Sequence, residues 1–347
     1  MTGQGGMTGQ TADQRLLAPS RILRTTPAQA GGGRERAGLV DSAREAIARG
    51  SKSFAMASRL FDRTTRERVW LLYAWCRRCD DLADNQELGG ALGDQAGVRD
   101  RLEAIRVLTR RALEGLPTAD PAFDGLGLLR VESGITAEMA GDVLAGFALD
   151  ADDWRPRTEA DLMRYCYHVA GAVGVMMAKV MGVPDDDADT LDRACDLGLA
   201  FQLANIARDV VEDDAADRCY LPVDWLVEED IEPGQHAKPH HRTELADMAA
   251  RLVALMDVHL AWARVGAARL PFRQRWAILA AARIYGAIGH TVRERGADAW
   301  GQRVVVSPGE KLRHVAGAFA EAMRNDPPTP AEAPRYSRLL LRPVAGW

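Results

Sequence analysis

The sequence predicts an all-α protein. Apolar residues recur at helical spacing along most of the 347-residue chain, and the longest run that suggests a strand is the short VVV segment at 304–306. Residues typical of helix N-termini, and Pro and Gly at helix C-termini, divide this periodic pattern into separate helices. Together these observations predict helices at 41–60, 64–85, 98–115, 136–149, 158–181, 188–214, 243–269, 272–296 and 308–324.

Capping patterns predict where three of these helices begin. A Ser or Thr followed three residues later by Glu fits a capping box, in which side chains satisfy the first free amides of a helix. The pairs are Ser42 with Glu45, Thr64 with Glu67, and Ser307 with Glu310, where Pro308 would occupy the first helical position. The stretch 217–242 lacks such a pattern, and a loop of this length in a compact domain is usually functional or mobile.

The chain is expected to have three parts. Residues 1–40 are rich in Gly, Gln, Thr and Arg and contain no apolar run, so we expect a disordered N-terminal extension. Residues 41–325 read as one helical domain, because no interdomain linker interrupts them. Residues 326–347 form a Pro-rich tail ending in RLLLRPVAGW, a basic and apolar mixture that either touches a bilayer or forms a frayed end.

Composition narrows the classes of partner and location. A hydrophobic content of 47% supplies a sizeable core, and a net charge of −5 without a basic stripe predicts no nucleic-acid partner. The chain has no 18 uninterrupted apolar residues, so no membrane span is expected. Five cysteines, an odd number within helical patterns, predict reduced thiols and a cytoplasmic location. Cys76 and Cys79 form a CxxC without a second ligand pair, which argues against zinc.

Two carboxylate pairs share a four-residue spacing. They are Asp80 with Asp84 in CRRCDDLAD and Asp209 with Asp213 in NIARDVVEDD. Residues four apart project from nearly the same face of a helix, where two carboxylates about 6 Å apart repel by roughly 3 kcal/mol. A buried cluster of this kind needs cations. Mg²⁺, or the similar Mn²⁺, binds a few carboxylates together with water and substrate phosphate oxygens, so the pattern predicts an enzyme that handles diphosphates.

The helix around the first pair carries a polar stripe. Steps of three or four residues join Tyr73, Arg77, Asp80, Asp81 and Asp84. Because apolar residues flank this stripe on both sides, we expect it to face the interior. The alternative is a surface helix with Arg–Asp ion pairs.

The helix around the second pair repeats this arrangement. Its polar residues are Gln202, Asn205, Arg208, Asp209 and Asp213. Asn205 lies one turn before Asp209 and can supply another oxygen ligand. Arg208 could bind a diphosphate, or it could pair with Glu212 four residues on.

Two further segments are candidates for the site. In YCYHVAGAVGVMMAKVMG, four residues one turn apart, with glycines between them, predict a tunnel wall or an ordinary buried helix: Tyr165, Val169, Val173 and Met177. His168 in this segment reads as an interior histidine. Ser51, Lys52 and Ser53 of GSKSF offer two hydroxyls and an amine to a phosphate, although such residues are also common at ordinary helix ends.

These motifs together resemble the squalene and phytoene synthase family, particularly its bacterial phytoene-forming members. GSKSF, LYAWCRRCDDLAD, YCYHVAG, LGLAFQLANIARDVVEDDAADRCYLP and ARIYGAIG occur in the family's order from about residue 45 to 305. The resemblance implies a single-domain isoprenoid synthase helical bundle around a deep apolar cavity. It also implies an activity in carotenoid biosynthesis: head-to-head condensation of two geranylgeranyl diphosphates, through a cyclopropylcarbinyl (prephytoene) diphosphate, to 15-cis-phytoene with release of two diphosphates.

The resemblance implies three groups of site residues. The metal ligands for Mg²⁺ are Asp80, Asp84, Asn205, Asp209 and Asp213. The substrate-binding residues are Ser51, Lys52, Ser53, Gln202, Arg208, Tyr285 and Arg303. The catalytic residues are Tyr73, Arg77 and Tyr165, the tyrosines lying beside the carbocations. No NADPH is expected.

Two other functions fit the same pattern. A squalene or dehydrosqualene synthase would use the shorter farnesyl diphosphate with the same motifs. A family-related assembly or scaffold protein would not need intact aspartate motifs, and both motifs are intact here. Expected partners, besides the substrate, are the inner face of the membrane through peripheral contact and the downstream carotenoid enzymes.

Overall fold

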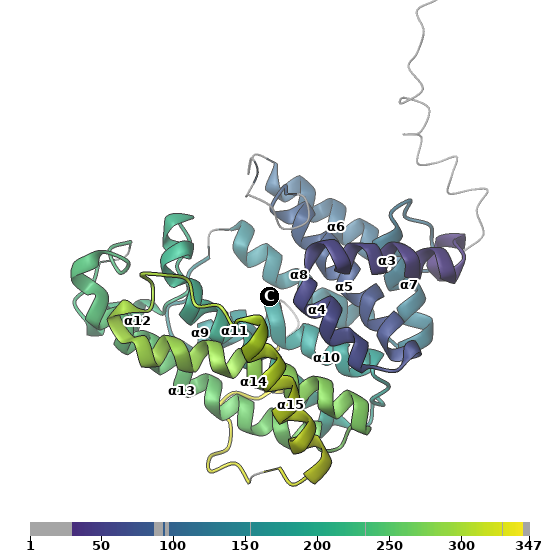
Figure 1. The fold of residues 1–347 in the computed structure, drawn as a ribbon. Coiled ribbons are helices and arrows are strands. Elements are labelled where there is room, and N and C mark those ends of the chain that lie inside the picture. The colour runs from purple at the N-terminus through teal and green to yellow at the C-terminus, as the bar shows by residue number, and fades with distance from the viewer. Residues whose placement is uncertain are drawn as a thin grey trace, which may run out of the picture.

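The computed structural model describes residues 30–86, 93, 97–152, 154–232, 234–327 and 329–342. Every regular element among these residues is a helix, which confirms the all-α prediction (Figure 1). Most of the predicted N-terminal extension, residues 1–29, and the last residues of the tail, 343–347, lie outside the described residues.

The helices follow one another with short connections. In chain order they are η1 (Ala30–Gly33), α3 (Arg36–Gly50), α4 (Lys52–Ala57), η2 (Ser58–Leu60), α5 (Arg63–Ala83), α6 (Val98–Leu113), α7 (Pro121–Ser133), α8 (Ala137–Ala151), α9 (Glu159–Cys166), η3 (Tyr167–Gly171), α10 (Ala172–Val180), α11 (Ala188–Ala215), α12 (Val223–Glu228), η4 (Pro239–His241), α13 (Arg242–Ala267), α14 (Phe272–Arg295), η5 (Gly296–Asp298), α15 (Pro308–Arg324) and α16 (Arg338–Leu341).

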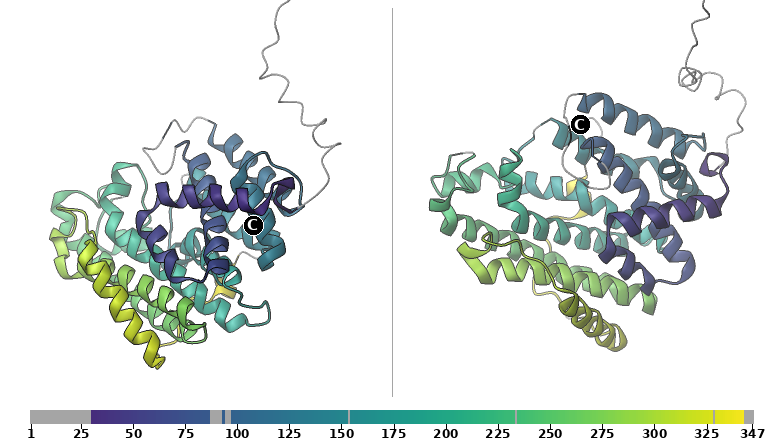
Figure 2. Two further views of the ribbon diagram at one scale, coloured as in Figure 1. Left: turned by 45° about the vertical axis from the view of Figure 1, so that its right-hand side comes forward. Right: turned by 45° about the horizontal axis from the view of Figure 1, so that its top comes forward.

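The bundle is built around the long helix α11. This helix packs along α13 and also contacts α10 and α14, while α5 packs against α3 and α7. Figure 1 shows the helices α3 to α7 gathered at one side and α13 to α15 at the other, and both views of Figure 2 keep this arrangement. One continuous apolar core includes residues of both groups, so the two aspartate-bearing helices α5 and α11 belong to one folded unit.

One predicted helix is wrong, because 41–60 is interrupted at Ser51. That residue has extended backbone angles (φ −153°, ψ 94°), so α3 ends at Gly50 and the chain continues in α4 and η2. The Ser42 cap is also wrong, because α3 already begins at Arg36.

The other two predicted caps have different outcomes. Asp62 and not Thr64 caps α5, since its carboxylate accepts a hydrogen bond from the Thr65 amide at 3.0 Å. The capping box of Ser307 and Glu310 is confirmed, with Pro308 in the first turn of α15.

Helix α7 was missed by the sequence prediction. Its start signal was present, because Asp120 caps the helix and Pro121 occupies the first turn, and Gly134 ends it in the left-handed conformation. Gly125 and Gly127 in its interior weakened the helical signal. The predicted irregular stretch 217–242 likewise contains two short elements, α12 and η4.

The predicted helix at 158–181 is observed as one curved rod with a π-helical segment at its centre. The π turn, η3, follows directly after Tyr165 and Cys166. Gly174 allows this rod to approach α11, because a Cβ atom there would lie 2.3 Å from the carbonyl oxygen of Ala194. Such π turns are frequent at functional sites.

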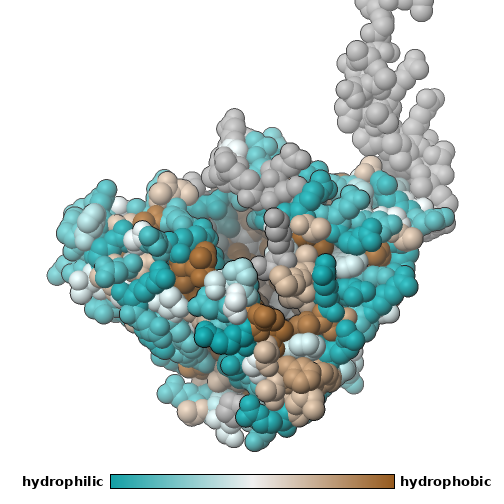
Figure 3. Space-filling model, in the orientation of Figure 1, coloured by the Kyte–Doolittle hydropathy of each residue, from teal (hydrophilic) through white to brown (hydrophobic). Residues whose placement is uncertain are grey.

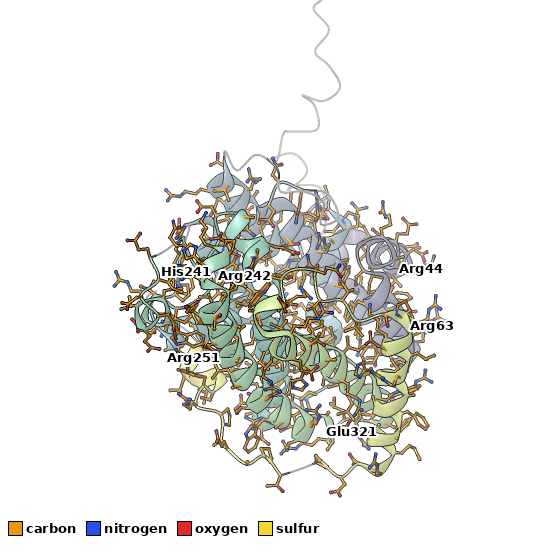
Figure 4. All side chains as sticks on the ribbon, turned by 60° about the vertical axis from the view of Figure 1, so that its left-hand side comes forward. Arg44, Arg63, His241, Arg242, Arg251 and Glu321 are labelled. Atoms are coloured by element: carbon orange, nitrogen blue, oxygen red, sulfur yellow. The ribbon has the colours of Figure 1, made fainter. Side chains whose placement is uncertain are left out.

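Helix α15 is fastened to the bundle by a shared carboxylate. Glu321 forms ion pairs with Arg264 of α13 at 3.2 Å and with Arg283 of α14 at 2.9 Å. Figure 4 shows its position near the end of α15. Among the residues described, none of the helices combines the length and apolarity that a bilayer-spanning segment requires.

Candidate active site

A cavity of about 880 Å³ lies between α5, α8, the α9–η3 rod and α11. The predicted site residues that line it are Tyr73, Arg77, Asp80, Asp84, Tyr165, Gln202, Asn205, Arg208, Asp209 and Asp213. Figure 3 shows a hollow near the centre of a largely hydrophilic face, bordered in part by hydrophobic residues. The fold therefore brings the polar stripes of both aspartate-bearing helices to one space.

The stripe on α5 is held by internal ion pairs. Arg77 contacts Asp80 at 3.0 Å and Asp81 at 3.2 Å. Asp81 is buried, whereas Asp80 and Asp84 line the cavity with side-chain exposures of 39% and 22%. The Arg–Asp pairs of the alternative prediction are present, but they face the cavity and not the outer surface.

Arg218 connects the two halves of the site. Its guanidinium lies 3.0 Å from Asp84 of α5, although it belongs to the segment that follows α11. Sequence reasoning did not select this residue. The available signal was its place directly after the second aspartate pair, in the stretch predicted to be either functional or mobile.

The pairs on α11 have a different arrangement. Arg208 bonds its own neighbour Asp209 at 2.7 Å, and Arg303 reaches the same carboxylate at 2.8 Å. The alternative pairing of Arg208 with Glu212 is wrong, because Glu212 pairs with Arg303. Within the described part of the chain, the Asp213 carboxylate has no hydrogen bond and no ion pair.

Burial leaves these carboxylates short of compensating charge. Burial raises the pKa of Asp213 to about 7. The nearby Asp209 carboxylate raises this pKa further, and Arg218 lowers it. Burial also raises the pKa of Asp80 to about 6, where Arg77 opposes the shift and Asp84 and Asp81 add to it. An additional cation in the cavity would relieve both effects.

The donor set suits a hard divalent ion that shares its coordination with other oxygens. Among the described residues, no three His, Cys, Asp or Glu side chains converge closely enough to hold a metal ion by themselves. Mg²⁺ usually takes one or two carboxylates and fills its shell with water and phosphate oxygens. The cavity offers such carboxylates on two sides, so its residues fit Mg²⁺ bound together with a phosphorylated ligand.

A tyrosine cluster forms another wall of the cavity. The hydroxyls of Tyr165 and Tyr220 both donate to Asp150, each at 3.1 Å. Their rings stack with centroids 4.7 Å apart, and Trp154 stacks on Tyr165 at 5.8 Å. Burial raises the pKa of Asp150 to about 6. Sequence reasoning missed Asp150 and Tyr220, because they come from separate segments that only the fold brings to Tyr165.

The apolar part of the cavity includes two of the residues predicted as a tunnel wall. Val169 and Val173 line it beside Val143 and Phe147 of α8, whereas Met177 is not among the lining residues. His168 is buried, and its Nδ1 lies 2.8 Å from the carbonyl oxygen of Asp142, as expected for an interior histidine. All five cysteines lie in the described part of the chain and none forms a disulfide, as predicted.

Three of the remaining predicted site residues, Ser51, Tyr285 and Arg303, are not among the residues that line the cavity. The hydroxyl of Ser51 caps α4 by accepting the Phe54 amide at 3.2 Å, and the Phe54 ring contacts Tyr73 with centroids 5.5 Å apart. Lys52 and Ser53 belong to α4, but their side chains lie outside the described part. Tyr285 stacks on Phe201 with centroids 3.9 Å apart, and Arg303 reaches the site through Asp209.

A helical bundle that directs two acidic helices, an aromatic cluster and an apolar wall into one cavity has the architecture of an isoprenoid synthase. The family model for squalene/phytoene synthase matches residues 47–310, and the chain belongs to this family. The predicted family is thereby confirmed.

Characterised relatives cover most of the chain. A phytoene synthase of Pseudescherichia vulneris is 45% identical over 308 residues, which is 88% of this chain and 98% of the relative. A 15-cis-phytoene synthase of Pantoea ananas is 45% identical over 299 residues, covering 84% of this chain and 96% of the relative.

Solved structures share the fold. A dehydrosqualene synthase in complex with a ligand superposes with a TM-score of 0.72 at 25% identity, covering 83% of this chain and 98% of that one. A squalene synthase from Alicyclobacillus acidocaldarius gives a TM-score of 0.67 at 23% identity over 77% of this chain and 98% of that one. The predicted isoprenoid synthase bundle is confirmed.

Proposed function

We propose that the protein is a prenyltransferase that makes 15-cis-phytoene in carotenoid biosynthesis. It joins two geranylgeranyl diphosphates head to head through a cyclopropylcarbinyl (prephytoene) diphosphate and releases two diphosphates. The observation that carries this proposal is the convergence of both aspartate pairs, with Arg77, Arg208 and Arg218, on one cavity that continues into an apolar wall. Relatives named as phytoene synthases, 45% identical over most of the chain, support the same reaction.

The metal assignment is part of the proposal. Asp80 and Asp84 on one side, and Asn205, Asp209 and Asp213 on the other, would hold Mg²⁺, with Mn²⁺ as a substitute. When bound, Mg²⁺ supplies positive charge to the departing diphosphate. The raised pKa values of Asp80 and Asp213 support a cation at this position.

The chain's own cations bind and orient the diphosphate. Arg77, Arg208 and Arg218 are half-buried or less exposed, so their charges act in a medium of lower effective dielectric than bulk water. Each is paired with an aspartate in the absence of substrate. An incoming phosphate can take over these guanidinium hydrogen bonds, which would free the aspartate oxygens to hold Mg²⁺.

The aromatic and apolar walls protect a carbocation. Asp150 fixes the rings of Tyr165 and Tyr220 against each other, so that aromatic surface lies at the cavity wall. Aromatic faces stabilise a nearby cation by roughly 1–2 kcal/mol when water is excluded. Val169, Val173 and Phe147 exclude water, which would otherwise trap the cation as an alcohol. The Tyr165 hydroxyl lies close enough to Asp150 to pass on a proton.

Squalene or dehydrosqualene synthesis from farnesyl diphosphate is the alternative function. The structural similarity to a dehydrosqualene synthase at 25% identity favours it, but its identity to the chain is lower than the 45% of the phytoene synthases. The non-enzymatic scaffold function has no support in the site, because both aspartate pairs are intact and line the cavity.

A product assay tests the function. Purified protein is incubated with Mg²⁺ and either C15 or C20 prenyl diphosphate, with and without NADPH, and the hydrocarbon is identified by mass spectrometry and chromatography. We expect 15-cis-phytoene from the C20 substrate without NADPH. A C30 hydrocarbon as the exclusive product would reject the proposed substrate while leaving the family assignment in place.

Location and partners complete the proposal. The substrate has a charged diphosphate head and the product is a hydrocarbon, so a cytoplasmic enzyme in peripheral contact with the inner face of the membrane, close to the downstream carotenoid enzymes, suits the reaction. Leu339 and Leu340 of α16 support membrane contact, because they are 71% and 67% exposed. Co-sedimentation with anionic vesicles should fall when both leucines are changed to Ser, and unchanged binding would reject this role of α16.

A further inference from the structure

A second large cavity lies outside the site described above. This α6–α8 groove has a volume of about 820 Å³ and is formed by the second half of α6, the end of α7 and the first half of α8. Helix α6 contacts both α7 and α8, and the three helices lie together in Figure 1. The groove is close in size to the active-site cavity, at about 880 Å³.

The floor of the groove is apolar. Leu113, Ile135 and Leu144 line it and are 6%, 1% and 8% exposed, so they are packed in place. Burying apolar ligand surface against such side chains contributes about 25 cal/mol per Å². The floor therefore suits a hydrocarbon chain.

The rim of the groove carries uncompensated positive charge. Arg106 and Arg110, one turn apart on α6, face it together with Arg130 of α7. Among the described residues, the side chains of Arg110 and Arg130 have no ion pair or hydrogen bond, and Arg106 has only a 3.8 Å contact with Glu103.

Acidic groups at the rim do not cancel this charge. They are Glu114 and Asp185, and Asp185 is already paired with Lys179 at 2.8 Å. Three guanidiniums at the mouth of an apolar groove suit a phosphate or diphosphate headgroup.

Two polar groups inside the groove point to a ligand independently of the arginines. Thr109 lines the groove at 4% exposure, and its hydroxyl has no hydrogen-bond partner among the described residues. The first-turn amides of α8 begin there at Ala137, after the Thr136 cap. Buried hydroxyls are rarely left unsatisfied, so the Thr109 hydroxyl is a candidate donor to a bound group.

Gly141 leaves the backbone of α8 bare where it faces the groove. No heavy atom lies within 4 Å of the position that a Cβ would occupy. A glycine inside a helix costs about 1 kcal/mol relative to alanine, and no packing contact explains this one. Close approach of a ligand to the helix backbone does explain it.

Helix α8 is a wall shared by the groove and the active-site cavity. Gly141 and Leu144 line the groove, whereas Val143 and Phe147 line the active-site cavity. A ligand in the groove therefore packs against the same helix as the substrate.

We infer that the α6–α8 groove is a second, non-catalytic binding site for one prenyl diphosphate. Arg106, Arg110 and Arg130 bind the diphosphate, and the hydrocarbon chain lies on Leu113, Ile135 and Leu144. The choice of a prenyl diphosphate over other anionic amphiphiles rests on the proposed function, which supplies this molecule as substrate.

Photocapture on the full-length protein tests this site. The probe is a geranylgeranyl diphosphate analogue with a diazirine in its chain, added with a chelator so that metal-dependent binding in the active site is suppressed. We expect saturable capture on peptides covering 106–114 and 134–144. The double variant Arg110→Gln/Arg130→Gln should reduce that capture at least tenfold, and Gly141→Phe, which fills the groove, should abolish it.

Matched controls make the result specific. Gly141→Ala, which adds a single methyl group, should lower capture less than Gly141→Phe, and Arg59→Gln/Arg313→Gln, which removes two arginines elsewhere, should leave it unchanged. The inference would be overturned if the uncharged geranylgeraniol probe were captured as well as the diphosphate probe. It would also be overturned if capture on these peptides were the same in Arg110→Gln/Arg130→Gln as in the wild type. Displacement by phosphatidylglycerol vesicles but not by unlabelled geranylgeranyl diphosphate would assign the groove to a membrane lipid. Capture requires no turnover, so a failure of the proposed reaction is measured separately.

Discussion

The two acidic helices carry the same spacing but treat their carboxylates differently. On α5, Asp80 pairs with Arg77, which it shares with Asp81, and Asp84 pairs with Arg218, so both carboxylates of the pair contact a cation. On α11, Arg208 and Arg303 both contact Asp209, while Asp213 has no ion pair among the described residues.

This difference teaches that the spacing alone does not make the two pairs equivalent. Both carboxylates of the α5 pair contact an arginine, although burial still raises the pKa of Asp80 to about 6, whereas the α11 pair leaves the half-buried Asp213 with a pKa of about 7. The shortage of positive charge is therefore concentrated at Asp213. A metal ion would change the electrostatics of α11 more than those of α5.

Removal of divalent ions is expected to have the largest effect. If both helices act through Mg²⁺, a chelator should lower turnover by more than about 10³-fold, and added Mg²⁺ should restore it. The measurement is hydrocarbon formation from labelled C20 diphosphate before and after metal addition. Full turnover in the chelator would mean that the two helices act without a metal.

Removing a single carboxylate should have the second-largest effect on activity, and the loss should be similar for the two helices. Asp84→Ala and Asp209→Ala are each expected to lower kcat/KM by about 10³-fold, because each removes a group aimed at the charge that develops on the diphosphate. Asp247→Ala on the exposed side of α13 is the control and should retain activity. Circular dichroism checks the fold, and wild-type activity in either variant would reject its role.

Replacing the arginine that pairs with each helix should reveal a further difference, because Arg218 pairs with Asp84 of α5 and Arg303 pairs with Asp209 of α11. Arg218→Gln is expected to lower kcat/KM by about 10- to 100-fold, because it removes the ion pair to the half-buried Asp84 and a charge-assisted contact to phosphate. Arg303 is 48% exposed, and Asp209 keeps Arg208, so Arg303→Gln should have a smaller effect. Steady-state kinetics with both variants makes the comparison, and the reverse order would contradict it.

The smallest expected effect concerns the stability of the metal-free protein. The pKa of Asp213 is about 7 in the folded state and near 3.8 when unfolded, so the folded state binds more protons between these values. Stability is therefore lost as pH rises from about 4 to 7. Asp213→Asn removes this loss and should raise the free energy of unfolding at pH 8 by about 1–3 kcal/mol, a range discounted for partial exposure.

Its control is the other aspartate of α11. Asp209→Asn breaks ion pairs with Arg208 and Arg303, so it should lower the free energy of unfolding under the same conditions. Urea titrations at pH 5 and pH 8 supply the measurement. A destabilised Asp213→Asn protein at pH 8 would show that Asp213 has a compensating partner in solution.

The candidate site could be predicted only in part. Arg77, Asp80 and Asp84 share one helix, so a four-residue spacing was enough to place them on one face. Asp150, Arg218 and Tyr220 could not be found in this way, because they come from α8 and from the segment after α11 and meet the site only through contacts distant in sequence. The break at Ser51 was also missed, since local periodicity continues across it.

The sequence by itself determined the helical class, most helix positions and the two acidic faces, because periodicity and spacing within one helix are local properties of the chain. Only the tertiary structure decided which cation pairs with which aspartate, since Arg218 and Arg303 lie outside both acidic helices. It also decided how deeply each carboxylate is buried. These two quantities set the charge balance of the cavity, and both depend on packing between segments far apart in the chain.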